Sequence, residues 1–176
     1  MVDINTIRQV KAFARQDGAL MSLLWIGSFL FSVQMPESSM GSFLALATPF
    51  FIGFRLKQFR NYALDGNISF RRGYAYVAYS FIYASLIFAL AQFLYFRYLD
   101  GGTFATTIAN TAQVLTPIYE QSGMSKQDID TSLSMMMDMK PIHWAIIFMM
   151  QNIFIGFLLA LPVAWAYRRN GYQQQA

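Results

Sequence analysis

The chain has 176 residues, of which 56% are hydrophobic and 12% are charged, and its mean hydropathy is +0.35. Soluble domains carry about 25% charged residues, so this composition excludes an ordinary globular protein and indicates a chain that buries much of its surface in lipid. The net charge of +4 does not indicate nucleic-acid binding, because the basic residues flank apolar runs instead of gathering in one patch. With no cysteine and one histidine, the sequence predicts neither a cofactor nor a metal site.

The N-terminal half predicts two membrane-spanning helices behind a basic lead-in. Residues 1–17 alternate basic and apolar side chains at helical spacing, which predicts an amphipathic helix on the cytoplasmic membrane surface. Residues 18–35 are uncharged and long enough for a first transmembrane helix. The alternative is a secretory signal peptide, but the run is longer than a usual signal-peptide core and no A-x-A cleavage site follows it. After a turn at Pro36, residues 38–54 form a shorter second span. Residues 55–72 then form a basic cytoplasmic loop.

Within this loop, Asp65, Gly66 and Asn67 indicate a turn, and Ser69 is expected to cap the helix that follows.

The C-terminal half predicts two further spans around a polar segment. Residues 73–96 form the third span, and residues 141–167 form the fourth, followed by a cytoplasmic tail over 168–176. Residues 98–140 contain an amphipathic helix that begins after a capping residue, Ser125. The predicted fold is therefore all-α: a four-transmembrane-helix bundle with an extracytoplasmic helical loop between spans three and four.

Charge predicts the orientation of this bundle. Of the 13 Lys and Arg residues, ten precede residue 18, lie in 55–72 or follow residue 167. The positive-inside rule places these segments in the cytoplasm, and so both termini of a multi-pass protein of the bacterial inner membrane.

Small residues recur every four positions in the second and fourth spans, and such stripes let two helices approach closely. The helix-packing residues are Gly41, Ala45, Pro49, Gly53, Gly156, Ala160 and Ala164. The stripes serve either packing within the bundle or docking of a partner or second copy.

Within the spans as predicted, no acidic or basic side chain lies near the middle, which disfavours a proton-coupled transporter. The polar groups Gln92, Gln151 and Asn152 are expected to hydrogen-bond between spans three and four, or else to contact a substrate. Three tyrosines share one face of the third span, either as core packing or as a lipid or ligand face together with two of these amides. That candidate face comprises Tyr76, Tyr79, Tyr83, Gln92 and Asn152.

The sequence contains no nucleophile elbow, Walker A motif or metalloprotease motif, so we expect no enzymatic activity. Methionines before His143 could hold Cu(I), but adaptable packing of an amphipathic helix explains them better. The basic residues of the 55–72 loop are candidates for binding a partner or anionic lipid, or they act as topology signals alone. They are Arg55, Lys57, Arg60, Arg71 and Arg72.

Two segments resemble a known family. The stretch FRNYALDGNISFRRGY at 59–74, and a last span that ends WAYRRN at 165–170, resemble the DUF4199 family of uncharacterised four-helix membrane proteins of Bacteroidota. The resemblance implies no activity, but members often occur beside glycosyltransferases that act on polyprenyl-phosphate lipids. We therefore expect a noncatalytic membrane subunit or scaffold that anchors or regulates such an enzyme. The alternative is a small oligomeric transporter or lipid-handling protein; the expected partners are the bilayer and a protein or second copy, not nucleic acid.

Overall fold

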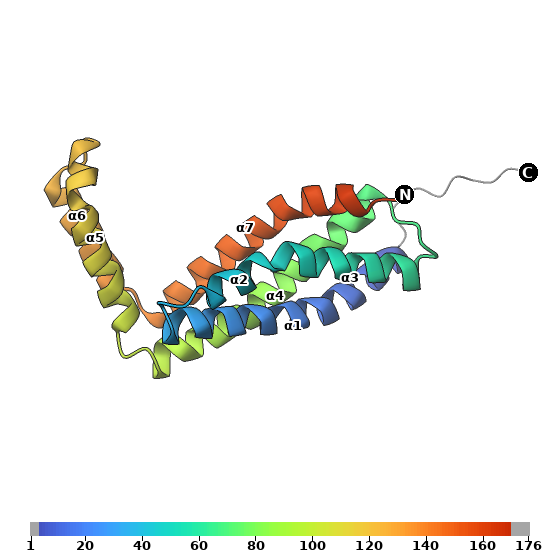
Figure 1. Cartoon of the computed structure of the whole chain (residues 1–176), viewed down its shortest axis with the longest axis horizontal. Helices are drawn as coiled ribbons and strands as arrows, with labels where there is room; N and C mark the ends of the chain where they lie inside the picture. The colour runs from blue at the N-terminus through green and yellow to red at the C-terminus, as the bar shows by residue number, and fades with distance from the viewer. Residues whose placement is uncertain (1–3, 170–176) are drawn as a thin grey trace, which may run out of the picture. The chain divides into compact units, whose positions relative to one another are not determined.

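The computed structural model describes residues 4–169, which form seven α-helices (Figure 1). The helices are α1 (Ile4–Gln34), α2 (Met40–Leu46), α3 (Thr48–Ala63), α4 (Phe70–Tyr98), α5 (Thr103–Gln121), α6 (Lys126–Met137) and α7 (Pro141–Tyr167). The prediction of an all-α fold is confirmed. Residues 1–3 and 170–176, which include most of the predicted tail, lie outside the described range.

Three helices, α1, α4 and α7, are long and apolar enough to cross a membrane. At 31, 29 and 27 residues, they are about 40–46 Å long, against a hydrocarbon core of about 30 Å. They carry the predicted first, third and fourth spans. The predicted second span, 38–54, is divided between α2 and α3 at Ala47, two residues before Pro49.

The chain divides into two compact units. Residues 90–147 form one unit, and the segments before and after them form the other, which we call the bundle. The helices α4 and α7 each contribute residues to both units.

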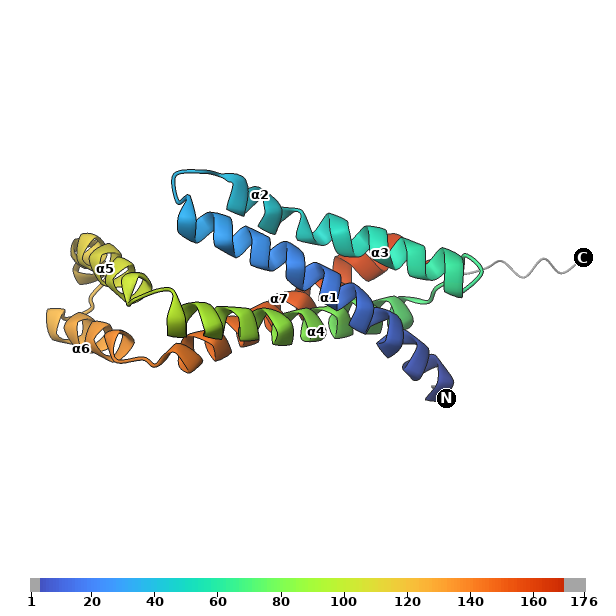
Figure 2. The same cartoon turned by 90° about the horizontal axis from the view of Figure 1, so that it is seen from below.

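Four groups of helices form the bundle: α1, the α2–α3 pair, α4 and α7 (Figure 2). Their shared core is apolar and rich in aromatic rings. The largest fully buried side chains in it are Tyr76, Phe59, Phe81, Met21, Ile52 and Leu56.

The predicted surface helix and first span are one continuous helix, α1. No proline interrupts the chain at the expected boundary, and Gly18 lies against α4: a Cβ there would come within 2.7 Å of the Ser80 carbonyl oxygen. Val10 and Ala14 are buried in the bundle core, so this part of the helix is not free on a membrane surface. Residues 10–14 therefore belong to the packed bundle, and the position of the lead-in at the membrane surface stays a prediction.

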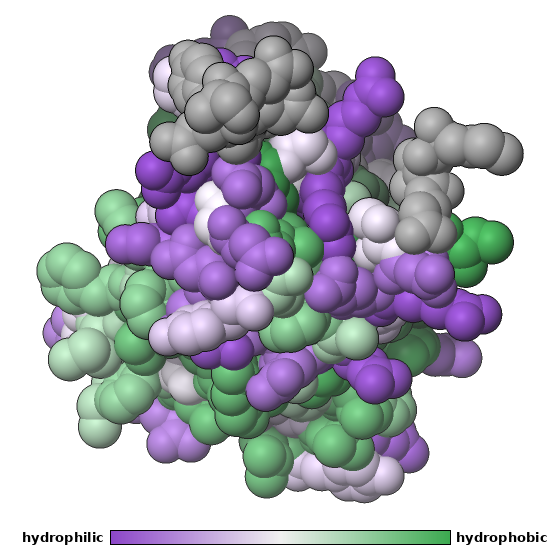
Figure 3. All heavy atoms as spheres, turned by 90° about the vertical axis from the view of Figure 1, so that its right-hand side faces the viewer, coloured by the Kyte–Doolittle hydropathy of each residue, from purple (hydrophilic) through white to green (hydrophobic). Residues whose placement is uncertain are grey.

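One end of the bundle carries the start of α1, the α3–α4 connection and the end of α7, and we call it the loop end. The backbones of Ile68 and Arg169 exchange two hydrogen bonds of 2.9 and 3.0 Å, and Arg60 Nη1 donates to the Tyr167 carbonyl at 3.1 Å. The predicted turn is present, with positive φ at Asp65 and Gly66. Figure 3 looks onto this end and shows hydrophilic residues gathered over it.

The connection also begins α4 as predicted. Ser69 Oγ accepts a hydrogen bond from Arg72 N at 3.4 Å, so Ser69 caps the first turn of the helix.

The second unit contains the α5–α6 hairpin. The predicted cap of α6 is confirmed, because Ser125 Oγ accepts a hydrogen bond from Asp128 N at 3.2 Å. Helix α5 was not predicted as a separate element. It begins where the Asp100 carboxylate accepts from Gly102 N and Phe104 N, each at 3.1 Å. Its threonine hydroxyls donate to carbonyls four residues earlier, so these polar groups are satisfied within the helix.

Candidate functional site

A charged cluster joins three helices of the bundle. Asp17 of α1 is 2% exposed, and its Oδ1 accepts a hydrogen bond of 2.6 Å from Arg55 Nε of α3. Its other oxygen accepts from the Tyr76 hydroxyl of α4. Arg55 Nη1 donates to Gln58 Oε1 at 2.7 Å. Both carboxylate oxygens are therefore satisfied, which a buried carboxylate requires.

The cluster is close-fitting because a glycine follows the aspartate. A Cβ on Gly18 would lie 2.9 Å from Tyr83 Cβ, closer than side chains tolerate, so the α1 and α4 backbones meet at this level. Tyr76 also stacks on Phe59 of α3, with ring centroids 4.9 Å apart and an angle of 8° between the planes. The arrangement holds α1, α3 and α4 together by charge and by packing. It is a structural joint with its donors and acceptors paired.

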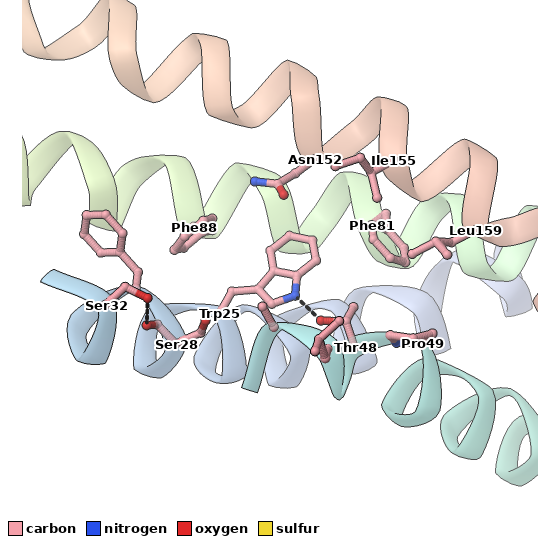
Figure 4. A pocket seen from close by; sticks show the side chains of 13 residues that line it. Trp25, Ser28, Ser32, Thr48, Pro49, Phe81, Phe88, Asn152, Ile155 and Leu159 are labelled. Carbon is pink, nitrogen blue, oxygen red and sulfur yellow. Dashed lines mark hydrogen bonds between the residues drawn. The ribbon is translucent and has the colours of Figure 1, made fainter. Parts of the chain in front are cut away.

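An apolar cavity of about 470 Å³ lies in the bundle beyond this joint (Figure 4). Its lining residues come from α1, α2, α3, α4 and α7: Trp25, Ser28, Phe29, Ser32, Ala45, Leu46, Thr48, Pro49, Phe81, Phe88, Asn152, Ile155 and Leu159. The Trp25 ring stands between Phe81 and Phe88, and its centroid lies 5.4 and 5.7 Å from theirs. Trp25 Nε1 donates to Thr48 Oγ1 at 3.0 Å, which occupies the indole donor.

The cavity has few polar groups that face its interior. Figure 4 shows Asn152 on α7 pointing toward the space that Trp25 and Phe88 border. Ser28 Oγ donates to the Gly41 carbonyl at 2.7 Å, and Ser32 Oγ donates to the Ser28 carbonyl at 3.0 Å. The Ser28 hydroxyl thus joins α1 to α2, the Ser32 hydroxyl bonds within α1, and the walls offer a ligand mainly hydrocarbon and aromatic surface.

The small-residue stripes have two roles in the structure. A Cβ on Gly41, Gly53 or Gly156 would lie within 2.1–2.8 Å of atoms on a neighbouring helix. Ala160 and Ala164 are buried. Ala45 and Pro49 instead line the cavity, where their small side chains leave room.

The tyrosine face does not surround this cavity. Tyr76 lies in the core on the charged cluster, and Tyr79 stacks with Tyr83 at a centroid distance of 6.5 Å. Gln92 belongs to the second unit, and its buried Oε1 has no hydrogen-bond partner within residues 4–169. Of the five residues proposed for a ligand face, Asn152 lines the cavity. The sequence analysis inferred a tyrosine face from the spacing along one helix. It could not show that α1 and α3 pack over Tyr76 and bury it.

Gln92 belongs to the second unit, whereas Gln151 and Asn152 belong to the bundle, so the hydrogen bonds expected among the three stay a prediction. Gln151 is exposed, and Gln92 Oε1 accepts none from the described chain.

The candidate basic residues divide into two sets. Three are engaged inside the bundle: Arg55 with Asp17, Arg60 with the Tyr167 carbonyl, and Arg72 with Gln9 Oε1. Lys57 and Arg71 are exposed. Sequence reasoning treated all five alike because their partners lie far away along the chain. Within residues 4–169, no group of three or more His, Cys, Asp or Glu side chains could hold a metal ion.

The long apolar helices and their shared core define an all-α protein with membrane-type helices. The family model "Protein of unknown function (DUF4199)" matches residues 16–169. The chain belongs to the DUF4199 family, and the resemblance seen in its sequence is confirmed. No curated protein and no solved structure matches it.

Proposed function

We propose that this chain is a noncatalytic membrane protein that binds an apolar chain, such as an acyl or isoprenoid tail of a membrane lipid, within its bundle. The apolar cavity of about 470 Å³ carries this proposal. Small-molecule sites are commonly apolar clefts of about 300–1,000 Å³ with a few polar groups. Aromatic rings at 25, 81 and 88 with the single amide of Asn152 suit a hydrocarbon chain better than a polar solute.

The topology that goes with this function has four passes, with both termini in the cytoplasm of the inner membrane. The α2–α3 pair supports the additional pass, because the break between them is slight. Ala47 keeps helical dihedrals, Ala47 N donates to the Phe43 carbonyl at 3.0 Å, and Phe51 N donates to the Ala47 carbonyl at 2.9 Å. Residues 40–63 are therefore nearly one helix of about 36 Å. The basic loop end would face the cytoplasm.

A second function, the scaffold expected from the sequence, is favoured by Lys57 and Arg71. Both are exposed, Lys57 on α3 and Arg71 at the start of α4, and they are available to an acidic surface of a protein partner, such as a membrane-associated glycosyltransferase. The other three basic residues contact the bundle itself, so fewer of them are free for a protein partner, and for that reason we place lipid binding first.

A matched pair of substitutions on α7 tests the lipid-binding proposal. Leu159 lines the cavity, whereas its neighbour Leu158 is exposed on the outer surface. Leu159→Trp would fill the cavity, and Leu158→Trp would add the same bulk outside it. Each protein is purified in mild detergent, and its lipids and co-purifying proteins are identified by mass spectrometry.

We expect a stoichiometric lipid on the wild-type and Leu158→Trp proteins and its loss from Leu159→Trp, with melting temperatures confirming that each is folded. The absence of a stoichiometric lipid on the wild type, or its retention by Leu159→Trp, would contradict lipid binding. A stoichiometric enzyme lost from a Lys57→Glu, Arg71→Glu variant would support the scaffold instead.

A further inference from the structure

A second pocket, polar and about 520 Å³ in volume, opens at the loop end of the bundle. It lies between the first turns of α1, the α3–α4 connection and the start of α4. Its lining residues are Asn5, Thr6, Gln9, Ala63, Leu64, Asp65, Asn67 and Arg72. The wall therefore offers one cation, one anion and several uncharged hydrogen-bonding groups.

The Arg72 guanidinium is held in place but has unused donors. Nη2 donates to Gln9 Oε1, and the group lies over the Phe59 ring at 5.9 Å. Arg72 Nε has no hydrogen-bond partner in the described chain but is buried, so a ligand would meet the terminal nitrogens of the guanidinium instead. A guanidinium has five N–H donors in a fixed fork, which matches the oxygens of a phosphate.

Gln9 fixes the wall from the other side. Its Nε2 donates to the Ala63 carbonyl at 3.3 Å, while its Oε1 accepts from Arg72. One side chain thus joins α1, the end of α3 and the start of α4, so the pocket has a defined shape before any ligand binds.

Asp65 decides which ligand the wall suits. It is exposed with φ at +48° in the turn, and among residues 4–169 the one ion pair is that of Arg55 with Asp17, so Asp65 has no cationic partner there. A simple anion beside Arg72 would be repelled by this carboxylate. A ligand with both a phosphate and an ammonium group would satisfy the two charges together.

We propose that this pocket binds a phosphoethanolamine group, with Arg72 holding the phosphate and Asp65 the ammonium. Thr6 and Asn67 supply hydrogen bonds to the remaining oxygens. The group belongs to a phospholipid headgroup at the membrane surface or to a soluble phosphoethanolamine ester. The proposal uses different residues from the apolar cavity and does not rest on lipid-chain binding there.

The experiment measures binding to the full-length protein by native mass spectrometry. The probes are phosphatidylethanolamine, phosphatidylglycerol, which lacks the ammonium, and water-soluble glycerophosphoethanolamine. The variants are Arg72→Gln, Asp65→Asn and the control Arg71→Gln, which removes the adjacent exposed arginine outside the pocket. Asparagine tolerates positive φ, so Asp65→Asn tests the pocket even if Arg72→Gln misfolds.

We expect phosphatidylethanolamine to bind more tightly than phosphatidylglycerol. Arg72→Gln and Asp65→Asn should each weaken it about tenfold, as expected for loss of one charge-assisted hydrogen bond, and Arg71→Gln should change it less than about twofold. Binding of glycerophosphoethanolamine with the same dependence on Asp65 identifies a soluble ligand, and its failure to bind identifies the lipid headgroup. Equal binding of the two lipids, or equal effects of Arg71→Gln and Arg72→Gln, would overturn the proposal.

Discussion

Arg55 Nε lies 2.6 Å from Asp17 Oδ1, although 38 residues separate the two side chains in the sequence. The Asp17 side chain is 3% exposed, and that of Arg55 is 23% exposed. Desolvation makes a pair of this kind costly to form, so its net contribution to folding is small, but removing one partner leaves an uncompensated charge. The pair should therefore be sensitive to single substitutions and tolerant of a matched double one.

We expect Asp17→Asn to lower the free energy of unfolding by about 3 kcal/mol, the lower part of the range for breaking a buried pair, because Arg55 remains partly solvated. The double variant Asp17→Asn, Arg55→Gln should be less destabilised than the two single effects predict when added. Chemical unfolding in detergent micelles measures the four proteins, and Glu37→Gln serves as an exposed-carboxylate control. Additive losses in the double variant would show that the two residues do not interact.

The Tyr76 hydroxyl is expected to contribute separately to this joint. Tyr76→Phe keeps the stacking on Phe59 but leaves Asp17 Oδ2 without its donor, which should cost about 1–3 kcal/mol. Tyr83→Phe removes a hydroxyl from a half-buried tyrosine of the same helix and should change stability by less. If the two variants unfold at the same denaturant concentration, the hydroxyl contact does not stabilise the fold.

Because α7 packs closely on α4 at Gly156, we expect a substitution there to destabilise the protein. A Cβ there would lie 2.4 Å from Phe81 Cβ, whereas a Cβ on Gly27 of α1 would meet nothing within 4 Å. Gly156→Ala should therefore destabilise the protein by about 1–3 kcal/mol through overpacking. Gly27→Ala should be neutral or slightly stabilising, because alanine favours the helix. The melting temperatures of the two variants, each compared with wild type, test this difference in stability. Equal shifts would mean that α7 does not approach α4 so closely.

Local sequence signals predicted the features that depend on neighbouring residues. The turn needs only residues that adopt positive φ, and each helix cap needs only a hydroxyl three residues before a free backbone N–H. The structure contains the turn at Asp65 and Gly66 and the caps at Ser69 and Ser125. Helix α5 was not predicted because threonine is a weak helix former. The hydrogen bonds from its threonine hydroxyls to carbonyls four residues earlier are visible only in the folded chain.

The candidate sites depend on residues far apart in the chain and could not be predicted in the same way. Asp17 was assigned to a surface helix because it precedes the uncharged run, yet its partners lie 38 and 59 positions later. The apolar cavity is lined jointly by residues of several helices, such as Trp25, Ala45 and Asn152, and no periodicity within one helix reveals that. The polar pocket likewise combines Gln9 with Arg72, 63 positions later.

The number of passes is testable directly, because the chain has no cysteine and any single introduced cysteine can be labelled selectively. Ser38 and Asn67 are exposed at the two ends of the α2–α3 pair, and Ser122 is exposed in the α5–α6 connection. In a four-pass protein with a cytoplasmic loop end, a membrane-impermeant maleimide should label Ser38→Cys and Ser122→Cys from outside intact spheroplasts. It should label Asn67→Cys in inverted vesicles only.

The variants Ser38→Cys and Asn67→Cys together show whether the α2–α3 pair crosses the membrane. If the α2–α3 pair does not cross the membrane, both positions lie on the same side and become labelled under the same condition. Labelling on opposite sides requires that the pair crosses.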